Sequence, residues 1–218
     1  MSSTQPTTDS VRQPALVIQF ARWPEAGKVK TRLASVLGDQ GALSAHVALC
    51  MAVLRQISAS GLPLELWWDR ALETPPPAAL PILTALERRN VRSGVQNGAD
   101  LGTRMEQALK DGLTRYERVL LVGSDCPSVD AQYLRRAVSA LDQSDVVIGP
   151  AEDGGFVLIG ARRVMPGMLA GIAWGKDSVR AETLAQFTRY GLSVSQLESR
   201  WDVDSPEDWE RYLALPKA

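Results

Sequence analysis

Short apolar runs separated by helical segments are the feature that most constrains how this chain can fold. Residues 15–21 read ALVIQFA and residues 119–122 read VLLV, and such continuous runs are typical of strands covered on both faces. Residues 101–113 instead repeat leucine or methionine at every fourth position, which indicates an amphipathic helix. Because strands and helices of these kinds alternate along the chain, we predict a mostly parallel sheet between two layers of helices.

The same patterns predict the order of the elements. We expect strands at residues 15–21, 64–68, 91–95, 119–122, 145–148, 156–159 and 192–195. We expect helices at about residues 40–58, 101–113, 131–141 and 178–190, and a short helix that ends at residue 89 after the proline-rich stretch 73–81. A last helix is expected to begin at Ser205 as N-cap, with Pro206 in its first turn. The predicted fold class is α/β, with three layers in the order α/β/α.

Length and composition suit one domain. A chain of 218 residues with 45% hydrophobic residues can bury a substantial core without disulfides. Residues 1–14 are polar and rich in Ser and Thr, without the apolar segment of a secretory signal, so we expect a disordered tail there. Residues 15–218 are expected to form a single α/β domain.

Charge and cysteine usage limit the partners and the compartment. The chain has 24 basic and 25 acidic residues, without the overall field that favours nucleic acid or membrane. No run approaches the roughly 20 apolar residues of a membrane helix. Cys50 and Cys126 lack the spacing of a metal site or disulfide framework, which indicates a reducing environment. We therefore expect a cytoplasmic protein that binds neither nucleic acid nor membrane.

A basic segment follows the first strand, at the edge where ligands bind in open α/β sheets. It reads RWPEAGKVKTRL and contains four cations, Arg22, Lys28, Lys30 and Arg32. These cations suit a polyphosphate, because lysine supplies a point charge and arginine a bidentate fork. If residues 28–32 are extended, their alternate side chains fall on one side. The alternative is a solvated basic loop, and the Walker pattern of glycines before Lys and Ser or Thr is absent.

The stretch VGSDCPSVD carries Asp125 directly after the buried run 119–122. Because the basic segment also follows a strand, both features are expected at the same edge of the sheet. Magnesium usually takes only one or two protein carboxylates and leaves its other positions to water and phosphate. Asp125 is therefore a candidate metal ligand, and the alternative is a turn or capping residue.

The stretch AEDGGF precedes an expected strand. Its paired glycines, Gly154 and Gly155, allow the backbone to approach a ligand closely. Glu152 and Asp153 are candidates to bind an acceptor hydroxyl or to serve as catalytic base. The alternative is a plain turn.

The stretch WDVDSPED places Asp202 and Asp204 two residues apart, so both carboxylates face one way if the segment is extended. One of them is then able to complete a magnesium site with Asp125. The alternative is helix capping, because acidic groups are favoured near a helix N-terminus.

Two other residues have weaker indications. His46, the single histidine, lies midway along an amphipathic helix and is expected to be packed or solvated, which argues against Ser-His-Asp chemistry. Trp174 lies in an expected loop, where it is a candidate to stack on a base or sugar.

Taken together, these stretches resemble the nucleotide-diphospho-sugar transferase superfamily with its Rossmann-like GT-A fold. The closest resemblance is to a branch of small, uncharacterised bacterial proteins assigned as glycosyltransferases. The matching segments span residues 20 to 209 and are FARWPEAGKVKTRL, QNGADLGTRM, VGSDCPSVD, GPAEDGGFVLIG, GIAWGKDSV and WDVDSPEDW. Ala26 departs from the pattern, since the family usually has proline there, and this changes the stiffness of the loop more than its charge.

The resemblance implies a role for each segment. It implies that Asp125 is the metal-binding aspartate, with Mg²⁺ or Mn²⁺ as cofactor, and that Asp204 is a second acidic position. It implies that the basic segment binds phosphate, and that Gln96, Gly102 and Arg104 lie near the nucleotide. We also expect Asp125 and Asp153 to be catalytic and Gly154, Gly155 and Trp174 to bind the acceptor.

Three functions remain open at this point. The first is glycosyl transfer from a nucleotide sugar, in which a nucleoside diphosphate leaves. The second is nucleotidyl transfer of the phospholactate guanylyltransferase or molybdenum-cofactor type, in which a nucleoside triphosphate is attacked and pyrophosphate leaves. The third is a nucleotide-binding module without catalysis. The two enzymatic readings share the broad class of transferase and require a small-molecule acceptor.

Overall fold

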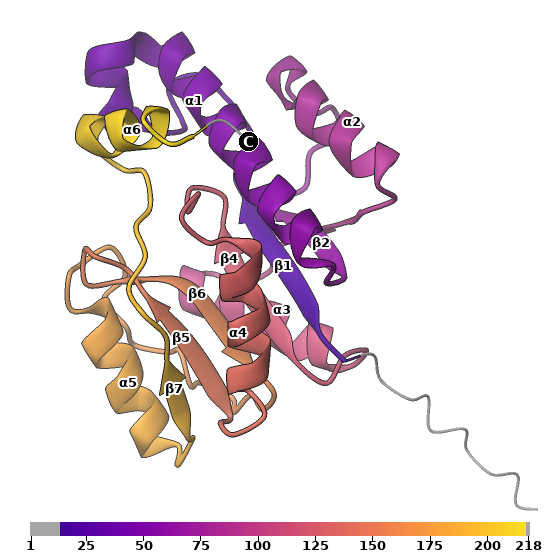
Figure 1. Cartoon of the computed structure of the whole chain (residues 1–218), viewed down its shortest axis with the longest axis vertical. Helices are drawn as coiled ribbons and strands as arrows, with labels where there is room; N and C mark the ends of the chain where they lie inside the picture. The colour runs from indigo at the N-terminus through magenta and orange to yellow at the C-terminus, as the bar shows by residue number, and fades with distance from the viewer. Residues whose placement is uncertain (1–13, 217–218) are drawn as a thin grey trace, which may run out of the picture.

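The structure is a computed structural model that describes residues 14–216 (Figure 1). The expected tail lies outside the described residues, apart from Pro14. One sheet of seven strands has the order β3-β2-β1-β4-β6-β5-β7. The strands are β1 Leu16–Ala21, β2 Leu64–Trp68, β3 Arg92–Val95, β4 Val119–Gly123, β5 Val146–Pro150, β6 Phe156–Ala161 and β7 Val194–Gln196.

Six α-helices connect and cover these strands in the described part of the chain. They are α1 Thr31–Ser60, α2 Leu80–Arg88, α3 Leu101–Leu113, α4 Ala131–Ala140, α5 Val179–Arg189 and α6 Pro206–Leu213, with a short 3-10 turn η1 at Pro77–Ala79. The predicted α/β class with a mostly parallel sheet is confirmed. Most predicted bounds agree with the structure to within about two residues.

The start of α1 departs from the prediction, because the helix begins at Thr31 rather than near residue 40. Gly38, with φ 67° and ψ 169°, interrupts the helical geometry and divides α1 into a short first part and a long second part. Glycine adopts such a conformation without the steric cost that other residues meet. The polar residues around this bend break the apolar periodicity, so the pattern predicts only the second part.

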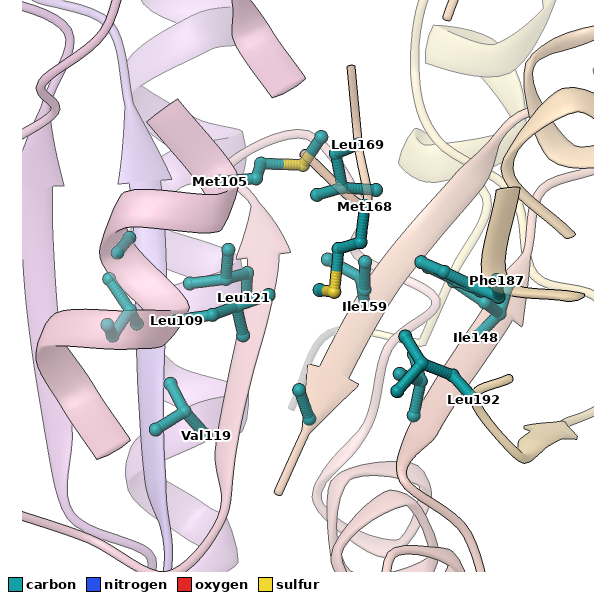
Figure 2. Close-up of a cluster of buried hydrophobic side chains, with 14 of the residues drawn as sticks. Met105, Leu109, Val119, Leu121, Ile148, Ile159, Met168, Leu169, Phe187 and Leu192 are labelled. Atoms are coloured by element: carbon teal, nitrogen blue, oxygen red, sulfur yellow. The ribbon is translucent and has the colours of Figure 1, made fainter. Parts of the chain in front are cut away.

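Helices cover both faces of the sheet. On one face α3 and α5 pack on the central strands, in a cluster that includes Met105, Leu121 and Phe187 (Figure 2). On the other face α1 and α4 pack in a second cluster, which includes Ile57 and Leu120. Because successive strand residues point to opposite faces, the neighbours Leu120 and Leu121 belong to different clusters. These two clusters form the cores of a three-layer fold.

β6 is antiparallel to both of its neighbours, β4 and β5, whereas the other strand pairs are parallel. In the register of the sheet, Phe20 pairs with Gly123 and Val122 pairs with Leu158. The first residue of β6, Phe156, therefore lies at the edge where β1 and β4 end. The segments after β1 and β4 and the turn before β6 meet at this edge.

The segment between β7 and α6 crosses the same edge. The backbone N–H of Val203 donates to the carbonyl oxygen of Asp125 at 2.9 Å. Trp201 and Val203 are buried with Leu33 of α1, and α6 packs against α1 (Figure 1). Residues 202–204 are thereby fixed beside the loop that follows β4.

α1 is by length and composition apolar enough to cross a membrane, with a mean hydropathy of 1.4 over its most apolar window. This departs from the prediction that no segment approaches the apolar length of a membrane helix. Half of the window, 50%, is buried inside the protein, where Val53 and Ile57 pack against α4 and the sheet. A packed core helix meets the same criteria of length and composition.

Ser205 caps α6 and holds the segment that carries Asp204. The Ser205 hydroxyl accepts from the N–H of Asp208 at 3.2 Å, and the Asp208 carboxylate accepts from the N–H of Ser205 at 2.8 Å. This reciprocal capping box satisfies two backbone donors that the helix leaves without partners.

We predict that Ser205→Ala lowers the free energy of unfolding by about 1 kcal/mol, because one of these donors loses its acceptor. Urea denaturation followed by circular dichroism measures the change. Ser199→Ala, an exposed position in the preceding loop, is the matched control and should leave the midpoint unchanged. An equal loss in both variants would show that the cap contributes nothing.

Candidate active site

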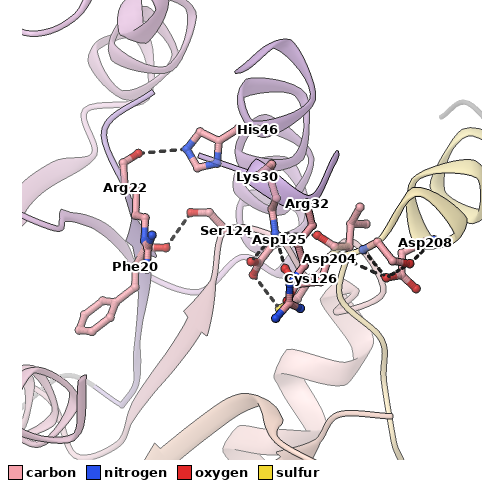
Figure 3. Close-up of polar contacts among 12 residues, drawn as sticks. Phe20, Arg22, Lys30, Arg32, His46, Ser124, Asp125, Cys126, Asp204 and Asp208 are labelled. Carbon is pink, nitrogen blue, oxygen red and sulfur yellow. Dashed lines mark hydrogen bonds and ion pairs between the residues drawn. The ribbon is translucent and has the colours of Figure 1, made fainter. Parts of the chain in front are cut away.

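Lys30 lies at the centre of the site, where the basic segment meets the acidic residues (Figure 3). Its ammonium donates to Asp125 Oδ2 at 2.8 Å, to Asp204 Oδ1 at 3.0 Å and to the carbonyl oxygen of Val203 at 2.6 Å. All three N–H donors of the ammonium are thereby used. The side chain is only 7% exposed, so its charge is compensated almost entirely by these partners.

The backbone of the basic segment turns rather than extends. The N–H of Lys28 donates to the carbonyl oxygen of Glu25, Gly27 has a φ of 72°, and Lys30 has a left-handed φ of 47° immediately before α1. The condition of an extended segment 28–32, under which alternate side chains would share one side, is therefore not met. The turn directs Lys30 inward, while Arg32, in the first turn of α1, reaches Asp204 at 3.3 Å.

Lys28 differs from the other two cations of this segment. It is 67% exposed and pairs with Glu25 at 3.0 Å. Lys28, Lys30 and Arg32 nevertheless all line one cavity, together with Arg22. The four cations predicted from the sequence therefore remain on one side of the molecule.

Three carboxylates come together around the Lys30 ammonium. Ligand atoms of Asp125, Asp202 and Asp204 all lie within 4.8 Å of one another. The sequence predicts one of the last two beside Asp125, and the structure brings both there. The alternation of WDVD was the signal for this, because residues 202 and 204 point the same way when residue 203 is buried.

The charges in this cluster move the pKa values in opposite directions. Burial raises the pKa of Asp125, but the Lys30 ammonium outweighs this effect and holds that pKa below its usual range. Burial lowers the pKa of Lys30, and the Asp125 and Asp204 carboxylates more than reverse this. Burial and the neighbouring charges of Asp125, Asp204 and Asp153 raise the pKa of Asp202 to about 7.

Buried polar groups hold the loop after β4 against β1. The Ser124 hydroxyl donates to the carbonyl oxygen of Phe20 at 2.7 Å and accepts from the Gln19 amide at 3.0 Å. His46, as expected, is packed: it is 6% exposed and its Nε2 lies 3.0 Å from the carbonyl oxygen of Arg22. Burial lowers the pKa of His46, so a neutral ring supports the start of the basic segment.

Two adjoining cavities open at this edge of the sheet. The first, of about 510 Å³, is lined by the four cations and by Gln96, Ser124 and Asp125, and we call it the cationic cavity. The second, of about 360 Å³, is lined by Phe20, Leu101, Met105, Phe156 and Trp174, with Asp153, Asp202 and Asp204 at its border, and we call it the apolar cavity. Asp204 of the acidic cluster lies where the two meet, since both cavities are lined by Phe20, Arg32, Leu101, Gly123, Gly175 and Asp204.

The three residues that the resemblance assigns near the nucleotide have different positions. Gln96 lines the cationic cavity, and its amide donates to the carbonyl oxygen of Trp67 at 2.9 Å. Gly102 is buried, and a Cβ there would lie 2.4 Å from the carbonyl oxygen of Leu169, so its role is close packing of α3. Arg104 donates to the carbonyl oxygen of Gly98 at 3.0 Å and lines neither cavity.

Of the residues expected to bind the acceptor, Gly155 and Trp174 line the apolar cavity and Gly154 does not. Asp153 and Gly155 line it, and Asp153 Oδ1 accepts from the N–H of Gly155 at 2.9 Å. Gly154 has a φ of 90°, and a Cβ there would lie 2.3 Å from the carbonyl oxygen of Asp177. Gly154 therefore packs the turn against the loop that carries Trp174 and is not among the lining residues.

Comparison with known proteins identifies the family. The family model described as uncharacterised proteins conserved in bacteria, DUF2064, matches residues 53–176, more than half of the chain. A solved structure of a candidate nucleotide-diphospho-sugar transferase from Desulfovibrio desulfuricans is 31% identical, with a TM-score of 0.79 over 88% of this chain and 83% of that one. The chain therefore belongs to the DUF2064 family of bacterial proteins. The resemblance predicted from the sequence motifs is confirmed.

More distant structures agree in fold. The CMP:2-keto-3-deoxy-manno-octonic acid synthetase, solved in complex with CTP, is 10% identical, with a TM-score of 0.59 over 93% of this chain and 98% of that one. The 4-diphosphocytidyl-2C-methyl-D-erythritol synthase of Anaerococcus prevotii is 13% identical, with the same TM-score over 93% and 97%. No curated protein matches the chain. By family and fold, the chain is an enzyme of the transferase class.

The raised pKa of Asp202 predicts a pH-dependent effect on stability. The folded protein binds the Asp202 proton more tightly than the unfolded chain, whose carboxyl pKa is near 3.8, so stability falls as the pH rises from about 4 to about 7. We expect Asp202→Asn, without divalent ions, to raise the free energy of unfolding by roughly 1–3 kcal/mol at pH 8. The gain should shrink at pH 5.

Urea titrations at the two pH values in the presence of a chelator measure this difference. Asp204→Asn is the matched comparison, since it removes a negative charge that pairs with the Lys30 ammonium and should lower stability at pH 8. A gain for Asp202→Asn that is the same at both pH values would contradict the prediction.

Proposed function

We propose that this protein is a divalent-metal-dependent transferase that uses a nucleotide-activated donor, with glycosyl transfer from a nucleotide sugar as the leading reaction. The observation that carries the proposal is the convergence of the basic segment and the acidic cluster at one edge of the sheet. Lys30 and Arg32 contact Asp204, and Asp125 lies on the other side of Lys30. Cations for phosphate and carboxylates for a metal are thus within reach of one diphosphate.

The donor set of the acidic cluster fits magnesium or manganese. Carboxylate oxygens are the ligands that such hard cations prefer, and Asp125, Asp202 and Asp204 offer three of them. The Lys30 ammonium lies among these oxygens, which indicates that the cluster needs a positive charge to be stable. When bound, the metal ion neutralises the charge that develops on the phosphate oxygens of the leaving group.

Lys30 has two roles in this proposal. Without ligands its ammonium is the internal counter-ion of Asp125 and Asp204. Asp125 and Asp204 would hold the metal ion, and the Lys30 ammonium would then have a phosphate oxygen of the donor as its partner. Arg22, Lys28 and Arg32 line the same cavity and contact the remaining phosphate oxygens, and Gln96 lines it with them.

Asp153 is the proposed catalytic base. It lines the apolar cavity, and its charge is close enough to raise the pKa of Asp202. In glycosyl transfer an acceptor hydroxyl attacks the anomeric carbon, its proton passes to Asp153, and the bond from that carbon to the nucleoside diphosphate breaks. Gly155 and Trp174 line the cavity beside Asp153 and contact the acceptor, and Gly154 holds the turn in place.

Nucleotidyl transfer is the second candidate, because the more distant fold neighbours are cytidylyltransferase-type synthetases. The same residues serve it, with attack at the α-phosphorus and pyrophosphate as leaving group. Incubation of the protein and Mg²⁺ with nucleotide sugars or nucleoside triphosphates and a set of acceptors separates the reactions. Release of nucleoside diphosphate supports glycosyl transfer, release of pyrophosphate supports nucleotidyl transfer, and tight binding without turnover indicates a non-catalytic module.

We also propose that residues 15–218 form one domain and that the protein works in the cytoplasm. Cys50 and Cys126 are both free and buried, which suits a reducing compartment.

We predict that Asp125→Asn abolishes the magnesium dependence of nucleotide binding, with a loss of affinity of at least about tenfold, equivalent to 1.4 kcal/mol. Isothermal titration with and without Mg²⁺ measures it. Asp130→Asn is the matched control: Asp130 caps α4 by accepting from the N–H of Tyr133, and asparagine caps equally well. Retained magnesium dependence in Asp125→Asn removes the metal assignment.

We predict that Lys30→Met has opposite effects on the two ligands. Affinity for Mn²⁺ alone should rise about tenfold, because the competing ammonium is gone, while affinity for the nucleotide should fall. Titration of Mn²⁺ into the nucleotide-free protein measures the first effect. Lys28→Met, at the exposed lysine of the same segment, should leave Mn²⁺ affinity unchanged. Weaker Mn²⁺ binding in Lys30→Met would mean that Lys30 does not occupy the ion's place.

A further inference from the structure

The two halves of the cleft have different chemistry. The cationic cavity gathers Arg22, Lys28, Lys30 and Arg32, and it suits the phosphates of the donor. The apolar cavity, on the other side of the acidic cluster, is lined mainly by large apolar side chains and backbone. A second substrate in this cleft therefore contacts a mainly apolar surface, whereas the phosphates of the donor contact a cationic one.

The apolar cavity has a continuous floor and an aromatic wall. Leu121 of β4 and Ile159 of β6 form part of the floor, which continues into the core cluster of Figure 2. Phe156 and Trp174 form the wall, with ring centroids 6.1 Å apart and an edge-on angle of 81°. Leu101, the first residue of α3, lines both cavities and is 42% exposed. Large apolar side chains left exposed in the lining of a cavity are typical of a ligand site.

The charged groups of this cavity do not favour a phosphate. Arg32 is engaged by Asp204 and belongs to the phosphate side in the proposed function. The groups that remain on the outer wall are Asp153, Asp177 and Lys176, with more negative than positive charge. An acceptor that carries a phosphate or carboxylate would be repelled by the two aspartates and would find one lysine.

We propose that the apolar cavity binds a neutral, phosphate-free acceptor whose ring has an apolar face, and that this acceptor presents a hydroxyl to Asp153. The inference rests on the proposed function, since it names the second substrate of that site. It favours transfer of a sugar to a neutral alcohol over transfer to a phosphorylated acceptor. The volume of about 360 Å³ is sufficient for a compound of one or two rings.

Phenyl α-D-glucoside and α-D-glucose 1-phosphate are matched probes, because they share the sugar and its anomeric configuration and differ in whether it carries a neutral ring or a phosphate. Saturation-transfer NMR and competition titrations on the full chain, with and without Mg²⁺, measure binding of each. We expect the phenyl glucoside to bind and glucose 1-phosphate not to compete with it. Competition by glucose 1-phosphate at equal or lower concentration would overturn the inference.

Leu101→Asp and Leu80→Asp form a matched pair of variants. Each leucine is the first residue of a helix, where aspartate is tolerated, and Leu80 is 65% exposed and lines neither cavity of the cleft. We expect Leu101→Asp to weaken binding of the phenyl glucoside about tenfold and Leu80→Asp to leave it unchanged. Trp174→Ala should weaken it similarly. Equal affinity in the wild-type protein, Leu101→Asp and Trp174→Ala would place the probe elsewhere and overturn the inference.

The probes also separate this inference from the proposed function. Titration of a nucleoside diphosphate with Mg²⁺ tests the cationic cavity and the acidic cluster without any acceptor. If nucleotide does not bind but the phenyl glucoside binds in a Trp174-dependent way, the transferase proposal fails and the ligand class of the apolar cavity stands. If nucleotide binds and the phenyl glucoside does not, the acceptor class is overturned and the transferase proposal stands.

Discussion

The contact of the Lys30 ammonium with Asp125 and Asp204 is the interaction on which the rest of the site depends. A lysine that is 7% exposed keeps its charge only because carboxylates and a carbonyl oxygen replace water around it. Its partners come from the loop after β4 and from the segment before α6, which are distant in the chain. One side chain therefore fixes the start of α1, the end of β4 and the C-terminal segment at one edge of the sheet.

This contact also explains how an acidic cluster is kept without a ligand. Three carboxylates lie within 4.8 Å of one another, and burial together with their repulsion raises the pKa of Asp202, which makes no ion pair with Lys30, to about 7. A divalent ion would relieve this repulsion more fully than one ammonium does. The free energy gained by relieving this repulsion would favour binding of the metal ion together with the donor. Metal affinity therefore depends on where the Lys30 ammonium lies.

Local sequence patterns predicted most helices and strands. The features that they missed depend on contacts between residues distant in the chain or on the conformation of a single glycine. The helix α3 and the capping box at Ser205 depend on spacings within a few residues, so the sequence is sufficient for both. The early start of α1 depends on the conformation of Gly38, which no periodicity reveals. The third carboxylate depends on the approach of residue 202 to residue 125. The packing role of Gly102 and the hydrogen bond that holds Arg104 to the carbonyl oxygen of Gly98 also depend on contacts that periodicity does not reveal.

The reversed strand β6 gives the cleft its second half. In an all-parallel sheet the strand beside β4 would bring its carboxyl end to the ligand edge, followed by a loop into a helix. Because β6 runs antiparallel to β4, its first residue, Phe156, is at that edge instead, directly after the turn that carries Asp153. Phe156 of the aromatic wall and the proposed base thus come from one reversal of chain direction. β4 supports both halves of the cleft, because Asp125 follows it on the donor side and Leu121 lies in the floor of the apolar cavity, whereas β6 lines the apolar cavity alone.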